Sequence, residues 1–315
     1  MLEYKKDYKA WAYMAIPLLL LSIFTFFPLL KTIGISLFSQ FDSTTNTFGT
    51  YFDFAAYVAV FKDPIFLNSI VNTLIIVFIS VPLSTGLALL IAVGLNSIKP
   101  LQKIFQTIFF IPYVTNVLAI GMVFNLIFFH SATPGILPEG LVNSLFNLSR
   151  DWVGTTATRS SWMVVVLIYV VWNGLPFKIL VFIGGLQNIS NQYYDAAKID
   201  SATPAKTLWR ITVPLLSPTI SYLLITSFIG AFKSYEAVLS VAGGTGTALD
   251  RDRWTIVAYV YDKIGIPGLD GKYISFYSRG AAAAVILFLI ILVFTFINLQ
   301  VSKRRVHYWG ELNDK

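Results

Sequence analysis

The sequence contains no cysteine, only two histidines and few charged residues. Charged side chains make up 12% of the 315 residues, about half the usual share for a soluble domain. Without cysteine, neither disulfides nor thiolate metal sites can form, and His130 and His307 are too few for a histidine-based metal cluster. These shortages exclude a cytosolic globular enzyme, a disordered chain and a secreted disulfide scaffold.

Sequence signatures of catalysis are missing as well. No lysine follows the glycines at 243, 244 and 246, so the chain has no G-x-x-x-x-G-K-[ST] phosphate-binding loop. It also lacks the G-x-S-x-G and H-E-x-x-H motifs, and no pair of carboxylates lies within an apolar run. We therefore expect no enzymatic activity, and no cofactor or metal ion bound by this chain.

Apolar residues are abundant instead. They make up 56% of the chain, and the mean hydropathy is +0.70. A helix needs ~20 apolar residues to cross a bilayer core of ~30 Å, and the charge-free runs of that length predict an all-α integral membrane protein with six transmembrane helices. Their expected bounds are 11–38, 68–95, 104–129, 161–186, 215–240 and 279–300. The runs do not alternate apolar and polar residues, as the strands of a β-barrel would.

The first apolar run has two interpretations, because Lys5, Lys6 and Lys9 precede it as they would precede a signal peptide. The run is longer than the apolar region of a signal peptide, and no small-x-small cleavage site follows it. We therefore expect an uncleaved transmembrane helix.

Lysine and arginine set the expected orientation. They are more numerous in the connections on the side of the amino terminus, which include 96–103 and 187–214, than in the opposite loops at 39–65, 130–160 and 241–278. This bias predicts that both termini are cytoplasmic. The net charge of +7 then belongs to an inner rim that faces lipid headgroups, with no nucleic acid as partner.

The inner connection at 190–218 differs from its neighbours and reads SNQYYDAAKIDSATPAKTLWRITVPLLSP. Ser190 or Asn191 can cap a helix start, and Thr203 followed by Pro204 can begin a second helix. We expect two short helices joined by a turn at Asp200 and Ser201. Tyr194, Ala197 and Ile199 are expected on one side of the first, and Leu208, Trp209 and Ile211 as apolar contacts of the second. Such a unit is either an interfacial helix resting on lipid or a docking element for another protein.

This segment resembles the EAA loop of the permease subunits of ATP-binding-cassette importers, whose pattern is E-A-A-x-x-D-G-A followed by I-x-L-P. The flanking segments GLPFKILVFIGGLQNI and AFKSYEAVLSVAGGTGTAL are similar to the sugar-permease branch. Asp195 replaces the usual Glu, and Ser201 replaces the usual Gly, which tolerates positive φ better. The loop residues that the resemblance assigns to coupling with an ATPase are Asp195, Ala196, Ala197, Asp200, Ser201, Ala202 and Pro214.

The resemblance implies the type I importer permease fold, called MetI-like, in a bacterial cytoplasmic membrane. It divides the chain into 1–65, with the first helix and an outer loop, a permease domain at 66–300 that contains the EAA loop at 190–214, and a cytoplasmic tail at 301–315. The implied partners are a second, distinct permease, two cytoplasmic ATPases that bind ATP and Mg²⁺, and an external solute-binding protein. The implied cargo is a carbohydrate, with glycerol 3-phosphate, a polyol or another solute as the alternative.

Polar and aromatic residues inside the expected helices are candidates for the cargo pathway, because sugars are held by aromatic stacking and hydroxyl hydrogen bonds. Each has a structural alternative, since Asn and Thr bridge helices in lipid, and Trp and Tyr mark the membrane interface. The candidates are Asn72, Tyr113, Asn116, Asn125, Tyr169, Trp172, Asn173 and Tyr235.

An ion-coupled secondary carrier is the rival from another class. Such a carrier needs ionisable groups near the membrane midplane. The available ones are Lys31, Lys178, Lys233, Glu236 and Arg279. Most of these are expected near helix ends, where long side chains reach water, and Lys233 and Glu236 are spaced to pair on one helix face.

Overall fold

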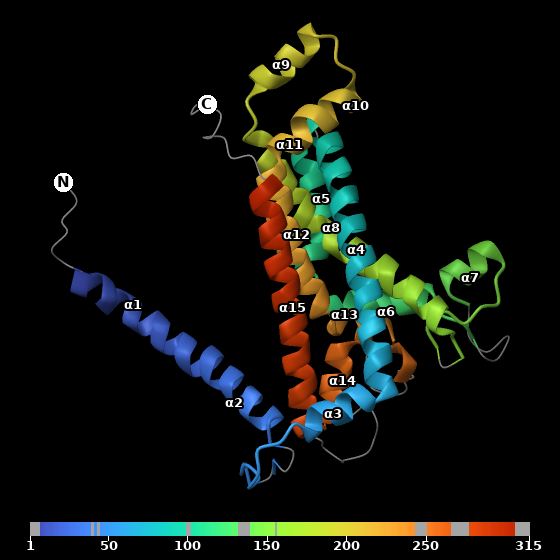
Figure 1. Ribbon diagram of the computed structural model, residues 1–315. Coiled ribbons are helices and arrows are strands. Elements are labelled where there is room, and N and C mark those ends of the chain that lie inside the picture. Colours follow the sequence, from blue (N-terminus) through green and yellow to red (C-terminus); the bar gives the residue numbers. More distant parts are fainter. Residues whose placement is uncertain are drawn as a thin grey trace.

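The computed structural model describes residues 7–38, 41–42, 45–98, 102–131, 139–154, 156–242, 251–265 and 277–305. Over these residues the chain is a bundle of helices (Figure 1). The expected tail beyond Arg305 and the glycines at 243, 244 and 246 lie outside them. The helices are α1 (Asp7–Leu21), a π-helical turn (Ser22–Phe26), α2 (Phe27–Ser36), α3 (Ala55–Lys62), α4 (Pro64–Ser97), α5 (Gln102–Val114), α6 (Val117–Ile127), α7 (Leu141–Phe146), α8 (Arg159–Gln187), α9 (Asn191–Ile199), α10 (Pro204–Thr207), a second π-helical turn (Leu208–Thr212), α11 (Val213–Leu215), α12 (Ser217–Phe232), α13 (Glu236–Val241), a 3₁₀ turn (Arg251–Arg253), α14 (Ile256–Lys263) and α15 (Tyr277–Arg305).

In the described part of the chain, four stretches of helix are long and apolar enough to cross a membrane, and two bent pairs of helices bring the number to six if each pair is one span. The four single spans are Lys9–Ser36, Pro64–Ser97, Arg159–Gln187 and Tyr277–Lys303. The expected all-α membrane fold is thus confirmed. The expected spans at 104–129 and 215–240 are wrong in one respect: neither is a continuous helix, because the structure breaks both.

The third expected span breaks at Asn116. This residue has extended backbone angles (φ −60°, ψ 125°), and its side chain accepts hydrogen bonds from the backbone N–H groups of Leu118 and Ala119. A capped helix start therefore lies in the middle of the apolar run. The axes of Ile104–Val114 and Val117–Ile127 differ in direction by 95°. Apolar composition alone did not reveal this break.

The fifth expected span ends early, at Phe232. Lys233 follows as the C-cap, and α13 starts a new helix at Glu236. At the other end the axis bends by 70° between Pro204–Leu215 and Ser217–Phe232, where prolines begin both α11 and α12. Because Lys233 and Glu236 belong to different elements, the helical spacing that would pair them is absent. The described residues show no ion pair between them.

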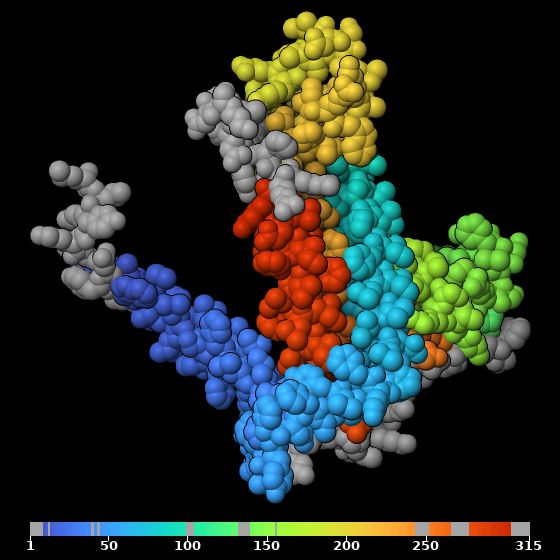
Figure 2. Space-filling model, viewed as in Figure 1, coloured from blue at the N-terminus to red at the C-terminus, as the bar shows by residue number. Residues whose placement is uncertain are grey.

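The first span forms an arm beside the bundle. Figures 1 and 2 show α1 directed away from the other helices, while α2 approaches α15. Apolar side chains are exposed around the arm, as with Phe24 and Leu30. A helix that is apolar on all sides is expected where lipid or another apolar protein surface surrounds it.

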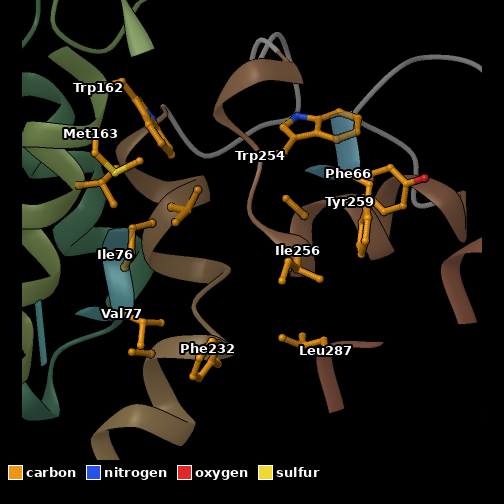
Figure 3. Close-up of a cluster of buried hydrophobic side chains, with 14 of the residues drawn as sticks. Phe66, Ile76, Val77, Trp162, Met163, Phe232, Trp254, Ile256, Tyr259 and Leu287 are labelled. Carbon is orange, nitrogen blue, oxygen red and sulfur yellow. The ribbon is translucent and has the colours of Figure 1, made fainter. Parts of the chain in front are cut away.

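The largest cluster of buried side chains lies between α4, α8, α12, α14 and α15 (Figure 3). Asp63 helps to set its geometry, because its carboxylate caps α4 by accepting from Ile65 N–H and also accepts the hydroxyl proton of Tyr259 on α14. Figure 3 labels Phe66, Ile76, Val77, Trp162, Met163, Phe232, Trp254, Ile256, Tyr259 and Leu287 of this cluster. We refer to this part of the molecule as the α14 end, and to the opposite part, with α9 and α10, as the α9 end.

Candidate functional site

The segment at 190–214, which we call the coupling loop, forms two short helices as expected. Ser190 caps α9 by accepting from Gln192 N–H at 3.4 Å, and Thr203 caps α10 by accepting from Lys206 N–H at 3.3 Å. Pro204 occupies the first turn of α10, where its missing N–H costs nothing. Figure 1 shows both helices beyond the ends of α4 and α8.

The turn between the two helices has Ser201 in a left-handed conformation, with φ of +52°. Ala202 N–H donates to Ala197 O at 2.9 Å and Ser201 N–H donates to Lys198 O at 3.0 Å. These two bonds form a Schellman motif, the helix ending in which glycine is usual at the left-handed position. Ser201, which replaces the glycine of the EAA pattern, thus occupies the left-handed position of the turn, where glycine is favoured.

Replacing Ser201 with glycine is expected to stabilise this turn by about 0.5–1 kcal/mol, because it removes the steric cost of a side chain at positive φ while adding some unfolded-state entropy. Hydrogen exchange at the amides of Ser201 and Ala202 should slow by roughly threefold. Ser201→Ala is the matched control: it removes the hydroxyl, keeps the Cβ and should bring no gain. Equal exchange in the two variants would contradict this account.

The coupling loop has an inner and an outer side. Ala197 is buried, and the Tyr194 hydroxyl lies 3.4 Å from the hydroxyl of Thr212. Ile199, expected on the same side as these two, is instead 85% exposed, because it lies two positions beyond Ala197 on the opposite face of the helix. Trp209, expected to make apolar contacts, is 66% exposed.

Small and charged residues accompany Ile199 and Trp209 on the outer side. Ala196, Asp200 and Ser201 are exposed. Asp195 is also exposed and forms an ion pair with Lys198 at 2.9 Å. Ala202 is half-buried, and Pro214 is exposed where the loop joins α12. The loop therefore presents an apolar and small-residue surface outside the bundle, with no covering element among the described residues.

A cavity of about 370 Å³ lies between α4, α5, α8 and α12. Two of the eight pathway candidates line it, Tyr113 from α5 and Asn173 from α8. The Tyr113 ring stacks on Phe177 with a centroid distance of 5.7 Å, and Asn173 donates to the Tyr169 hydroxyl at 3.4 Å.

Asn72 lies at the α14 end, away from this cavity, and joins three segments: α4, residues 252–254 and the start of α8. Its amide Nδ2 donates to the carbonyl oxygens of Asp252 and Trp254 at 2.8 and 2.9 Å. Its Oδ1 accepts from Arg159 Nε at 2.8 Å. The side chain is fully buried and engaged with protein on both sides of its amide.

The other candidates contact protein groups within the bundle. Asn116 caps α6 through Leu118 and Ala119 N–H. Asn125 donates to Val241 O at 2.8 Å and joins α6 to α13, where Gly121 also contacts Ser240. The Tyr169 hydroxyl donates to Val117 O at 2.7 Å. The remaining two are in ring contacts, Trp172 with Phe124 and Tyr235 with Tyr261.

Lys178 is one of the five ionisable residues of which most were expected near helix ends, and the structure does not place it near one. It lies well inside α8, is only 6% exposed and lines the cavity beside Ser84. The signal in the sequence was its position as the single charged residue inside the run 161–186. Among the described residues, no group of three or more His, Cys, Asp or Glu side chains could hold a metal ion.

Curated proteins similar to this chain are transport permeases. The lactose transport system permease protein LacF of Rhizobium radiobacter is 25% identical over 95% of this chain and 95% of its own length. The arabinooligosaccharides transport system permease protein AraP of Bacillus subtilis is 31% identical over 76% of this chain and 73% of its own length.

A solved structure with the same fold is that of a bacterial ABC transporter involved in the import of the acidic polysaccharide alginate. It matches with a TM-score of 0.73 and 20% identity over 95% of this chain and 96% of that chain. The family model described as "Binding-protein-dependent transport system inner membrane component" matches residues 10–307. The chain is therefore a multi-pass membrane permease and not an enzyme, and it belongs to the family of inner membrane components of binding-protein-dependent transport systems.

Proposed function

We propose that this permease imports a carbohydrate as part of an ATP-binding-cassette importer whose ATPase subunits dock on the coupling loop. The observation that carries this proposal is the exposed outer side of the loop, with Ala196, Ile199 and Asp200 beyond the end of the bundle. The chain has no phosphate-binding loop of its own, so ATP and Mg²⁺ would be bound by the partner subunits. Closure of those subunits would move the loop and, with it, the helices to which it is joined.

The carbohydrate cargo is supported by the relatives, which transport lactose and arabinooligosaccharides according to their names. Glycerol 3-phosphate, a polyol or another solute is the alternative cargo for the same machinery. The remaining proposed partners are a second, distinct permease, which would cover apolar faces such as that of α1, and an external solute-binding protein. An ion-coupled carrier is no longer supported, because the family depends on binding proteins.

We further propose that the α9 end is cytoplasmic, with both termini on that side. The carboxyl end of α15 lies at the α9 end (Figure 1) and carries Lys303, Arg304 and Arg305. Lysine and arginine clusters beside a membrane span favour the cytoplasmic side.

Purification of the affinity-tagged full chain from its host membrane tests this function. We expect ATPase subunits and a second permease to copurify, and cargo uptake to stop when ATP is depleted. A chain that purifies without any nucleotide-binding subunit and continues to transport after ATP depletion would be a carrier and would overturn the proposal.

A further inference from the structure

The cavity in the bundle contains a buried cation. The Lys178 ammonium lies among side chains of α4, α5 and α8, and the residue is 6% exposed. A charged side chain at such depth in a membrane protein is costly unless it has a partner, and it is found mainly where it serves a pathway or a ligand.

Lys178 has no carboxylate partner in the described part of the chain. The sequences of α4, α5, α6, α8, α12 and α15 contain no Asp or Glu. Glu236 is adjacent to Ala237, which lines the cavity, but it forms no ion pair with Lys178. Among the described residues the ammonium donates one hydrogen bond, to Ser84 Oγ, whose own proton goes to Ser80 O. Two ammonium hydrogens therefore remain for a ligand.

The other groups around the cavity are suited to a sugar. Tyr113 lines the cavity, is 51% exposed and stacks on Phe177, so that an aromatic ring is available to pack against a sugar. The Ser80 hydroxyl is buried and has no hydrogen-bond partner among the described residues. Thr226, Ser227 and Ser234 add further hydroxyl-bearing residues to the lining.

We propose that Lys178 forms a subsite for the anionic group of an acidic carbohydrate, either a uronate carboxylate or a sugar phosphate. This rests on the proposed function, in which the cargo is a carbohydrate. An oxyanion compensates the ammonium charge and accepts its two remaining hydrogens in charge-assisted bonds, whereas a neutral sugar leaves the charge uncompensated. Gly174 leaves room beside the ammonium, since a Cβ at that position would be in van der Waals contact with Nζ at 3.7 Å.

Binding of three probes that differ only at carbon 6 tests the subsite: galactose, galacturonate and galactose 6-phosphate. The complete importer, purified in detergent without its solute-binding protein, is titrated calorimetrically with each. We expect at least one of the two anions to bind tenfold or more tightly than galactose, and the stronger of them identifies the carboxylate or the phosphate as the preferred group. Lys178→Met should reduce that affinity to the level of galactose, and Lys178→Arg should preserve the preference.

Several outcomes would overturn the subsite. These are equal affinities for the three probes, no binding of either anion, or an anion preference that survives in Lys178→Met. If Lys178→Met no longer copurifies with the partner permease but keeps its anion preference, Lys178 instead forms an ion pair with a carboxylate of that partner. Gly174→Val is a second variant, which keeps the charge but should weaken anion binding by crowding Nζ. Copurification of the ATPases reports on the proposed function separately, so that either hypothesis can fail alone.

Discussion

Replacing Asn72 with leucine is expected to destabilise the α14 end of the bundle by roughly 3 kcal/mol. The leucine fits the volume of the site but leaves the carbonyls of Asp252 and Trp254 without their donor. It also removes the acceptor of Arg159 Nε, a guanidinium whose Nη2 is already buried without a partner. Each buried polar group that loses its partner costs about 1–3 kcal/mol. Movement of the Arg159 side chain toward water recovers part of this total free energy.

Thermal unfolding of the purified protein in detergent, followed by tryptophan fluorescence, measures this loss. Asn125→Leu is the matched control, because it makes the same substitution but removes a single hydrogen bond, to Val241 O. The melting temperature should fall clearly further for Asn72→Leu than for Asn125→Leu. Equal melting temperatures for the two variants would show that the contacts of Asn72 do not hold the three segments together.

Asn72 also illustrates what the sequence could and could not predict. An asparagine inside an apolar run indicates a buried polar contact, and both possibilities, cargo or protein, were open from the sequence. The deciding partners are backbone carbonyls 180 and 182 residues away. No local pattern encodes that distance, so the choice needed the tertiary structure.

Helix breaks were predictable only where the sequence has the usual capping residues and proline. The coupling loop has Ser190, Thr203 and Pro204 at helix starts, and both short helices were expected from them. The break at Asn116 depends on one cap residue between two apolar runs. The hydropathy of the sequence predicts a single span there, because hydropathy measures transfer into lipid and carries no information on the direction of the chain.

The depth of Lys178 was missed for a related reason. Long side chains near the end of a span reach water, and its position in the sequence was compatible with that. In the structure, the Lys178 ammonium donates to Ser84 Oγ on α4, and the residue is only 6% exposed. Helix packing thus converts an apparent interfacial lysine into a buried one.

Asp200→Arg is expected to abolish ATPase association and transport while leaving membrane insertion normal. Asp200 is exposed at the end of α9 and has ordinary backbone angles (φ −75°, ψ 6°), so that arginine fits there without strain. A cation at a helix carboxyl end is favourable for the helix dipole. The loop should therefore keep its fold, and the effect should fall on the surface that docks the ATPase.

The expected loss is large because a reversed charge in an interface leaves its partner unpaired, at a cost of about 2–5 kcal/mol, which exceeds a tenfold change in affinity. Copurification of ATPase subunits and ATP-dependent uptake in membrane vesicles measure it. Lys62→Glu is the control, since it reverses an exposed charge at the end of α3, at the α14 end of the molecule. Normal ATPase association and uptake in Asp200→Arg would place the motor's docking surface elsewhere, because the loop can transmit force only to a subunit that it contacts.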